Sequence, residues 1–304
     1  MAVYITRRLI QAVIIMFLLS ILFFALVNMA PGGPLAGYGQ SRRISQEKLV
    51  LLKRQLGLDK PLSVQYLVWL AGNDWMKIDA DGDGIAESYG TRRGILRGDF
   101  GYSFRTRQPV LNEIFVRLPN TIYLMSVTLL AALGIAIPIG VISAIKQYSI
   151  FDVAVTTFAF AGQALPDFWL GLILILIFYV WLKNPVTGDP LLPVGGIYTI
   201  GAPFSIMDRI LHLILPVTAG ALGWLAWYSR FLRSSMLDVI NQDYLRTARA
   251  KGLSQNRVMF KHALRNALIP LVTILALDLP FIIGGAVFIE MLFAWPGMGL
   301  LYYQ

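Results

Sequence analysis

The sequence contains no cysteine and only two histidines. Without thiols it has no disulfide, zinc-thiolate site or cysteine nucleophile. His212 and His262 lie far apart, at opposite ends of the predicted topology, so they do not form a paired metal or catalytic site. The sequence has no GxxxxGK[ST] phosphate-binding loop, and no serine stands in a nucleophile and base arrangement. We therefore predict that the chain is not an enzyme, has no catalytic residues and does not itself bind ATP.

Charged side chains are also scarce, at 14% of residues against 57% hydrophobic. A chain of 304 residues with this balance is too apolar for a soluble globule and indicates an all-α polytopic membrane protein. Its net charge of +9 comes from basic residues in loops between apolar runs. The positive-inside rule, by which loops rich in Lys and Arg stay in the cytoplasm, explains that pattern more simply than binding to nucleic acid. We therefore expect no nucleic-acid partner.

Five apolar runs are long enough to span a bilayer, and each is predicted to be a membrane-spanning helix. The third run contains Pro166, which is expected to break or kink its helix. A cytoplasmic N-terminus follows from Arg7 and Arg8 before the first run. The predicted spans are residues 9–30, 118–145, 151–182, 210–228 and 266–289.

The predicted organisation has three parts. Residues 1–30 form the cytoplasmic N-terminus and first helix, residues 31–117 an external loop subdomain, and residues 118–304 a membrane core. Between the fourth and fifth spans, eight basic residues face only Asp238 and Asp243, which places this loop in the cytoplasm. We take the functional loop as residues 238–265.

The segment 243–270 is the most informative stretch of the chain. Residues 244–252 favour a short helix that ends at Gly252, and Ser254 is a candidate N-cap for a second helix. Such a projecting helix suits a groove on another protein. The alternative is a solvated basic turn whose only partners are anionic lipid headgroups.

Within this segment, RTARAKGL resembles the EAA loop of bacterial ABC importer permeases, in the dipeptide, oligopeptide and nickel branch. Arg246 stands where that family has its acidic residue, and Pro270 lies farther from Gly252 than in the general pattern. Further similar stretches follow in the family's order: GDFGYSF (98–104), RLPNT (117–121), PDFWLGL (166–172) and FAWPGMG (293–299).

The resemblance implies the type I ABC importer transmembrane fold and a permease subunit in a prokaryotic inner or plasma membrane. Its implied partners are a second, homologous permease, two ABC ATPases that bind ATP and magnesium, an external binding protein and the lipid bilayer. Di- or oligopeptides are the expected cargo, with oligosaccharide, glutathione or a nickel chelate as alternatives. Family members have six spans, so the five predicted here suggest that the last one is missing by truncation.

The same resemblance implies an ATPase-coupling loop. We expect Leu245, Ala248 and Arg249 to enter a groove on the ATPase, with Arg246 and Lys251 at its acidic rim. The full predicted set is Tyr244, Leu245, Arg246, Thr247, Ala248, Arg249, Lys251 and Gly252.

Three acidic residues lie within or at the end of apolar spans: Asp167, Asp278 and Glu290. A carboxylate in hydrocarbon costs a few kcal/mol, so each must face a cavity, a partner group or water. One interpretation is that they line a translocation pathway and attract the cationic end of a substrate. The other is structural, with Asp167 capping a half-helix and Asp278 and Glu290 pairing with a neighbouring subunit.

The external region contains DADGDGIAE, residues 79–87, whose spaced carboxylates suit a hard cation. The candidate calcium ligands are Asp79, Asp81, Asp83 and Glu87. Gly90 stands where a complete EF-hand loop has glutamate, and a solvated acidic turn is the alternative.

A transporter of another class, driven by ions through Asp167 and Asp278, would be expected to show internal inverted repeats. None is seen between the two halves of the sequence. Collapse of uptake by an uncoupler with ATP intact would favour this alternative.

Overall fold

The computed structural model describes residues 1–31, 33–35, 53, 57–79, 87–103 and 105–303. These residues are mainly helical, and the chain divides into two compact units, Met1–Leu111 and Asn112–Gln304. Four described helices are long and apolar enough to cross a membrane, and a bent pair makes a fifth candidate span. The predicted helical membrane architecture is therefore confirmed.

The first unit contains one long apolar helix and a small polar subdomain. Its elements are α1 (Ala2–Met29), η1 (Gly33–Leu35), α4 (Leu62–Ala71), strands β1 (Lys77–Ile78) and β2 (Ser88–Tyr89), and η2 (Ile95–Arg97). The strands pair antiparallel, with Lys77 opposite Tyr89. The hydroxyls of Ser20 and Tyr66 lie 2.7 Å apart and join α1 to α4. The alternation of leucines and charges over residues 45–56 also predicts a helix, but these residues lie outside the described part of the chain, except residue 53.

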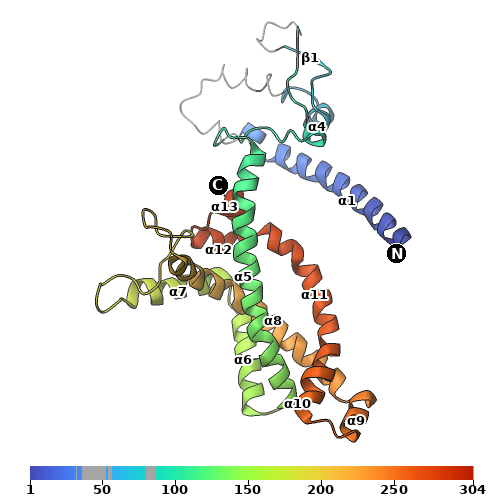
Figure 1. The fold of residues 1–304 in the computed structure, drawn as a ribbon. Helices are drawn as coiled ribbons and strands as arrows, with labels where there is room; N and C mark the ends of the chain where they lie inside the picture. The colour runs from blue at the N-terminus through green and yellow to red at the C-terminus, as the bar shows by residue number, and fades with distance from the viewer. Residues whose placement is uncertain (32, 36–52, 54–56, 80–86, 104, 304) are drawn as a thin grey trace. The chain divides into compact units, whose positions relative to one another are not determined.

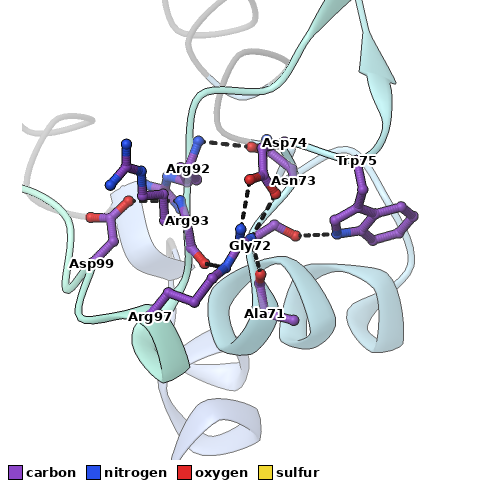
Figure 2. Close-up of polar contacts among 9 residues, drawn as sticks. All are labelled: Ala71, Gly72, Asn73, Asp74, Trp75, Arg92, Arg93, Arg97 and Asp99. Carbon is purple, nitrogen blue, oxygen red and sulfur yellow. Dashed lines mark hydrogen bonds and ion pairs between the residues drawn. The ribbon is translucent and has the colours of Figure 1, made fainter.

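Two carboxylates organise the polar part of this unit (Figure 2). Both oxygens of Asp74 accept hydrogen bonds of 2.6 Å from Arg97, which also donates to the carbonyl of Ala71. Asp99 accepts from the backbone N–H groups of Arg93, at 2.9 Å, and Gly101, at 3.0 Å. The bonds from Arg97 lower the pKa of Asp74, and those backbone donors lower the pKa of Asp99.

These lowered pKa values predict that the polar subdomain of the first unit is sensitive to acid. A carboxyl group whose pKa is depressed by folding contributes stability above its unfolded pKa of about 3.9, and that contribution is lost as the pH falls through the folded value. Protease resistance of this unit in the intact protein should therefore hold down to about pH 4 and decline below it. The Asp99→Asn variant should lose part of this acid dependence; an unchanged pH profile would contradict the assignment.

The second unit is built from helices that run between two ends of a bundle (Figure 1). Its elements in order are α5 (Val110–Ile145), α6 (Ile150–Ala164), α7 (Asp167–Ile175), η3 (Leu176–Trp181), α8 (Ile206–Ile240), α9 (Asp243–Ala250), α10 (Gln255–Arg257), η4 (Val258–Ala263), α11 (Leu264–Gly284), α12 (Val287–Leu292) and α13 (Met298–Tyr303). Of these, η3 and η4 are π-helical, and α5 starts two residues before the unit boundary.

The break expected at Pro166 is present, and it is large. Helices α6 and α7 are bent by 99° around residues 165 and 166. Because proline has no N–H to donate and its ring clashes with the preceding turn, the backbone hydrogen bonds of α6 do not continue through Pro166, and the helix ends at Ala164. Asp167 then begins α7, which runs crosswise to α6 in Figure 1.

Three predicted helix ends were wrong. Charge and hydropathy locate the ends of an apolar segment, whereas the helix itself can continue past them or stop before them. The fourth helix was expected to stop at Tyr228 but continues to Ile240. The second was expected from Leu118 but starts at Val110, with a Glu113 to Arg117 ion pair of 3.4 Å in its first turns. The fifth was expected through Ile289, but α11 ends at Gly284 because Gly285 has φ +78°.

Candidate functional site

The loop between α8 and α11 contains the predicted short helix. Helix α9 covers Asp243–Ala250 and is followed by Gly252 at φ +78°, a left-handed conformation that suits glycine and ends the helix. Ser254 occupies the N-cap position of α10, although its side chain makes no capping hydrogen bond. In Figure 1, α9 and α10 lie together at one end of the bundle.

The inner face of α9 packs against the chain's own core. Leu245 is 0% exposed and Ala248 9%, and both belong to one apolar cluster with Val258 and Met259. They are three residues apart, so they share one helix face. The prediction that Leu245 and Ala248 enter a groove on a partner was therefore wrong, because the chain itself already buries both side chains.

The outer face of α9 is exposed and basic. Arg246, Thr247, Arg249 and Ala250 are exposed there, and Lys251 and Gly252 extend the surface beyond the helix end. We call these six residues the α9 outer face. Tyr244, at the edge of the helix, accepts a hydrogen bond of 2.7 Å on its hydroxyl from the side chain of Asn266 at the start of α11.

The core cluster beneath α9 connects it to three long elements of the bundle. It contains buried residues from α5, α8, η4 and α11, listed here by element: Ala136, Val141 and Ala144; Tyr228, Leu232 and Met236; Val258, Met259 and Ala263; Ala267 and Leu271. Protein interiors are close-packed and of low compressibility, so they transmit strain between the elements that contribute to them. A force applied to the α9 outer face would therefore act on α8 and α11 together.

A buried ion pair beside this cluster joins α8 to α6. Arg233 donates to both oxygens of Asp152, at 2.6 and 2.7 Å, and Asp152 also accepts from the Tyr148 backbone N–H at 2.8 Å and from the Ser143 hydroxyl. The side chain of Asp152 is 3% exposed. A bidentate pair of this kind fixes orientation as well as distance. Sequence reasoning missed it and counted Arg233 only as a loop charge.

The predicted pathway acids are in three different environments and are not brought together as one group. Asp278 accepts a hydrogen bond of 2.7 Å from the hydroxyl of Tyr228, which ties α11 to α8. Asp167 is exposed at the start of α7, and its Oδ1 lies 3.5 Å from where a Cβ on Gly223 would be. The carboxylate of Asp167 accepts no hydrogen bond from the residues that the structure describes, and Pro166 occupies the N-cap position of α7.

Glu290 is fully buried, at 0% exposure, and joins three elements at the opposite end of the bundle from α9. Its carboxylate accepts from the Thr121 hydroxyl at 2.8 Å and from the Leu300 backbone N–H at 3.0 Å. Thr121 in turn accepts from the N–H of Met298 at 2.7 Å. This geometry supports the structural interpretation of Glu290, although the pairing is inside the chain and not with a neighbouring subunit.

Two of the four candidate calcium ligands, Asp81 and Asp83, lie outside the described residues. The other two flank this gap: Asp79 directly follows strand β1, and Glu87 directly precedes strand β2. Among the residues that the structure describes, no group of three or more His, Cys, Asp or Glu side chains is placed to hold a metal ion.

Comparison with known proteins covers nearly the whole chain. Residues 136–304 match the family described as binding-protein-dependent transport system inner membrane component, and residues 1–125 match its N-terminal counterpart. The chain is 44% identical over 303 residues to the oligopeptide transport system permease protein AppB of Bacillus subtilis, covering 99% of this chain and 86% of that protein.

Two further relatives are similar over comparable lengths. The dipeptide transport system permease protein DppB of Escherichia coli K12 is 37% identical over 295 residues, covering 92% of this chain and 80% of that protein. The di/tripeptide transport system permease protein DppB of Pseudomonas aeruginosa is 38% identical over 307 residues, covering 97% and 85%.

Proposed function

The chain belongs to the family of binding-protein-dependent transport system inner membrane components, and we propose from this premise that it is a permease subunit importing short peptides. Three relatives are named for oligopeptide, dipeptide and di/tripeptide transport, which favours peptide over the sugar, glutathione and nickel alternatives. The subunit supplies helices around a translocation pathway, and energy comes from ATP hydrolysis on separate subunits.

The observation that carries the coupling role is the two-sided character of α9. Its inner face is fixed in the core, with Leu245 at 0% exposure, whereas its outer face is exposed and basic. Such a helix can receive motion on one side and pass it on from the other. The proposed receiver surface is the α9 outer face, and the proposed partner is an ATPase with an acidic rim around its docking groove.

The proposed assembly contains this chain, a second homologous permease, two ATPases and an external binding protein. The chain lies in a prokaryotic inner or plasma membrane, with its N-terminus and the α9 loop in the cytoplasm and the residues around β1 and β2 outside. ATPase movement displaces α9, the core cluster moves α8 and α11, and the Arg233 to Asp152 pair moves α6 with them.

ATP-driven uptake of a labelled dipeptide into proteoliposomes containing the full assembly tests the proposal. We expect uptake to require ATP and the binding protein, and to persist when an uncoupler removes ion gradients. Uptake that collapses with the uncoupler while ATP is intact would contradict the proposal.

A further inference from the structure

One face of α8 carries a pattern that neither the coupling role nor the fold explains. Gly223, Trp227 and Arg230 are spaced at i, i+4 and i+7, so they form one stripe along the helix. Asp167 of α7 lies against Gly223, within 3.5 Å of its would-be Cβ position. The stripe thus presents an acidic group, an aromatic ring that is 43% exposed and a basic group in succession.

The basic end of the stripe is positioned by α6. The Arg230 guanidinium lies over the Phe160 ring, with 4.4 Å between the guanidinium carbon and the ring centroid, and it donates to the side-chain oxygen of Gln163. Its Nε donates to the carbonyl of Ala226 at 3.3 Å. The remaining guanidinium nitrogen, Nη1, makes no hydrogen bond within the described residues. Because Phe160 and Gln163 precede the bend at Pro166 and Asp167 follows it, the two charges flank this bend.

Neither charge has an ionic partner in the described chain, although both lie within segments apolar enough to span a membrane. A charge on a membrane-spanning helix must face a cavity, water or another polar group, since exposure to hydrocarbon costs several kcal/mol. An acid and a base on the same face, with no ion pair between them, form a complementary surface for a molecule that carries both charges.

The spacing indicates the size of that molecule. Gly223 and Arg230 are seven positions apart, so their backbone positions are separated by roughly 10 Å along the axis of α8. An extended peptide covers about 3.3–3.6 Å per residue, so two or three residues fill this gap. Trp227 lies between the two ends, where its ring is available to a peptide side chain.

We propose that Asp167 and Arg230 hold the two ends of a short zwitterionic peptide during translocation, the carboxylate of Asp167 binding its ammonium group and the guanidinium of Arg230 its carboxylate. This inference deepens the proposed function and rests on it. The site is a transit site on this chain, separate from the site on the external binding protein that captures the peptide.

The test uses the complete assembly in proteoliposomes and three probes: L-alanyl-L-alanine, its N-acetylated form and its C-terminal amide. A charge-assisted hydrogen bond contributes about 1.5–3 kcal/mol, equivalent to a factor of about 10–140. Asp167→Asn should lower uptake kcat/KM of the free dipeptide and the amide by at least about tenfold and leave the acetylated form unaffected. Arg230→Gln should affect the free and acetylated peptides and spare the amide.

Each comparison is the ratio of uptake kcat/KM between a variant permease and the unmodified permease for the same peptide. The binding protein is the same in both measurements, so its preference among the peptides cancels in the ratio. Arg209→Gln, which removes a cation stacked on Tyr198 and Phe204 at the other end of α8, should change none of the three ratios. Equal losses for all three peptides would overturn the proposal, as would unchanged uptake. Failure of either variant to assemble with the second permease would assign these charges to the subunit interface instead, and would also overturn it.

The proposed function fails differently. If the unmodified assembly takes up none of the three peptides on ATP, the peptide assignment is wrong and the transit site has no ligand of this class. If it takes up peptides on ATP but the variants show no selectivity for the peptide ends, the proposed function stands and the site does not.

Discussion

Replacing Ala250 with tryptophan is expected to lower ATP-dependent uptake by at least about tenfold, because a bulky ring on the α9 outer face obstructs docking of the ATPase at a cost of about 1.4–3 kcal/mol. Ala250 is exposed at the end of α9, so the new side chain does not displace the buried cluster. The loss of helix propensity is below about 0.7 kcal/mol. Uptake in proteoliposomes and retention of the ATPase during purification measure the effect.

The matched control is the same substitution two residues earlier. Ala248 is only 9% exposed and packs in the core cluster, so Ala248→Trp should destabilise the chain itself by about 1–3 kcal/mol. The two variants separate docking from folding: Ala250→Trp should keep wild-type thermal stability and lose the ATPase, whereas Ala248→Trp should lose stability. Normal uptake by a stable Ala250→Trp assembly would contradict the proposed docking face.

Replacing Asp152 with alanine is expected to destabilise the chain by about 3 kcal/mol or more, since it leaves a partly buried arginine without its counter-charge. Arg233 is 24% exposed at its side chain, which places the loss at the lower end of the range for such pairs. The substitution also removes the acceptor for the Tyr148 N–H and the Ser143 hydroxyl. Denaturant or thermal unfolding in detergent measures the effect.

A double-mutant cycle tests whether the loss belongs to the pair. The Asp152→Ala and Arg233→Met double variant should be less destabilised than the sum of the two single variants, by about 1–3 kcal/mol. Additive losses would show that the two side chains do not stabilise each other. Because the pair joins α6 to α8, variants that remain folded should also import less peptide per ATP hydrolysed than the unmodified assembly.

Local chemistry allowed several parts of this fold to be predicted from the sequence. Pro166 broke the third span because proline cannot continue a helix ladder, and Gly252 ended α9 because it accepts a left-handed conformation. The charges Arg230 and Arg233 misled the prediction of the α8 end. Arg230 stacks on Phe160 and Arg233 pairs with Asp152, so α8 continues beyond both residues.

Contacts between distant residues limited the prediction of the site. The spacing of Leu245 and Ala248 marks one apolar face, and Val258 and Met259 downstream signal an apolar cover for it. No local pattern, however, assigns that face to the chain instead of a partner. Asp152 and Arg233 are likewise far apart in sequence, and their pairing depends on how α6 packs against α8.

The most direct test of the account is a cross-link from the α9 outer face. The chain has no cysteine, so a single Ala250→Cys substitution gives one reactive position. In the intact assembly, a bifunctional reagent should link position 250 to the ATPase, and Ala202→Cys, in the exposed loop before α8, should give no such product. A link to the ATPase from position 202, or none from position 250 in an assembly that imports peptide, would contradict the account.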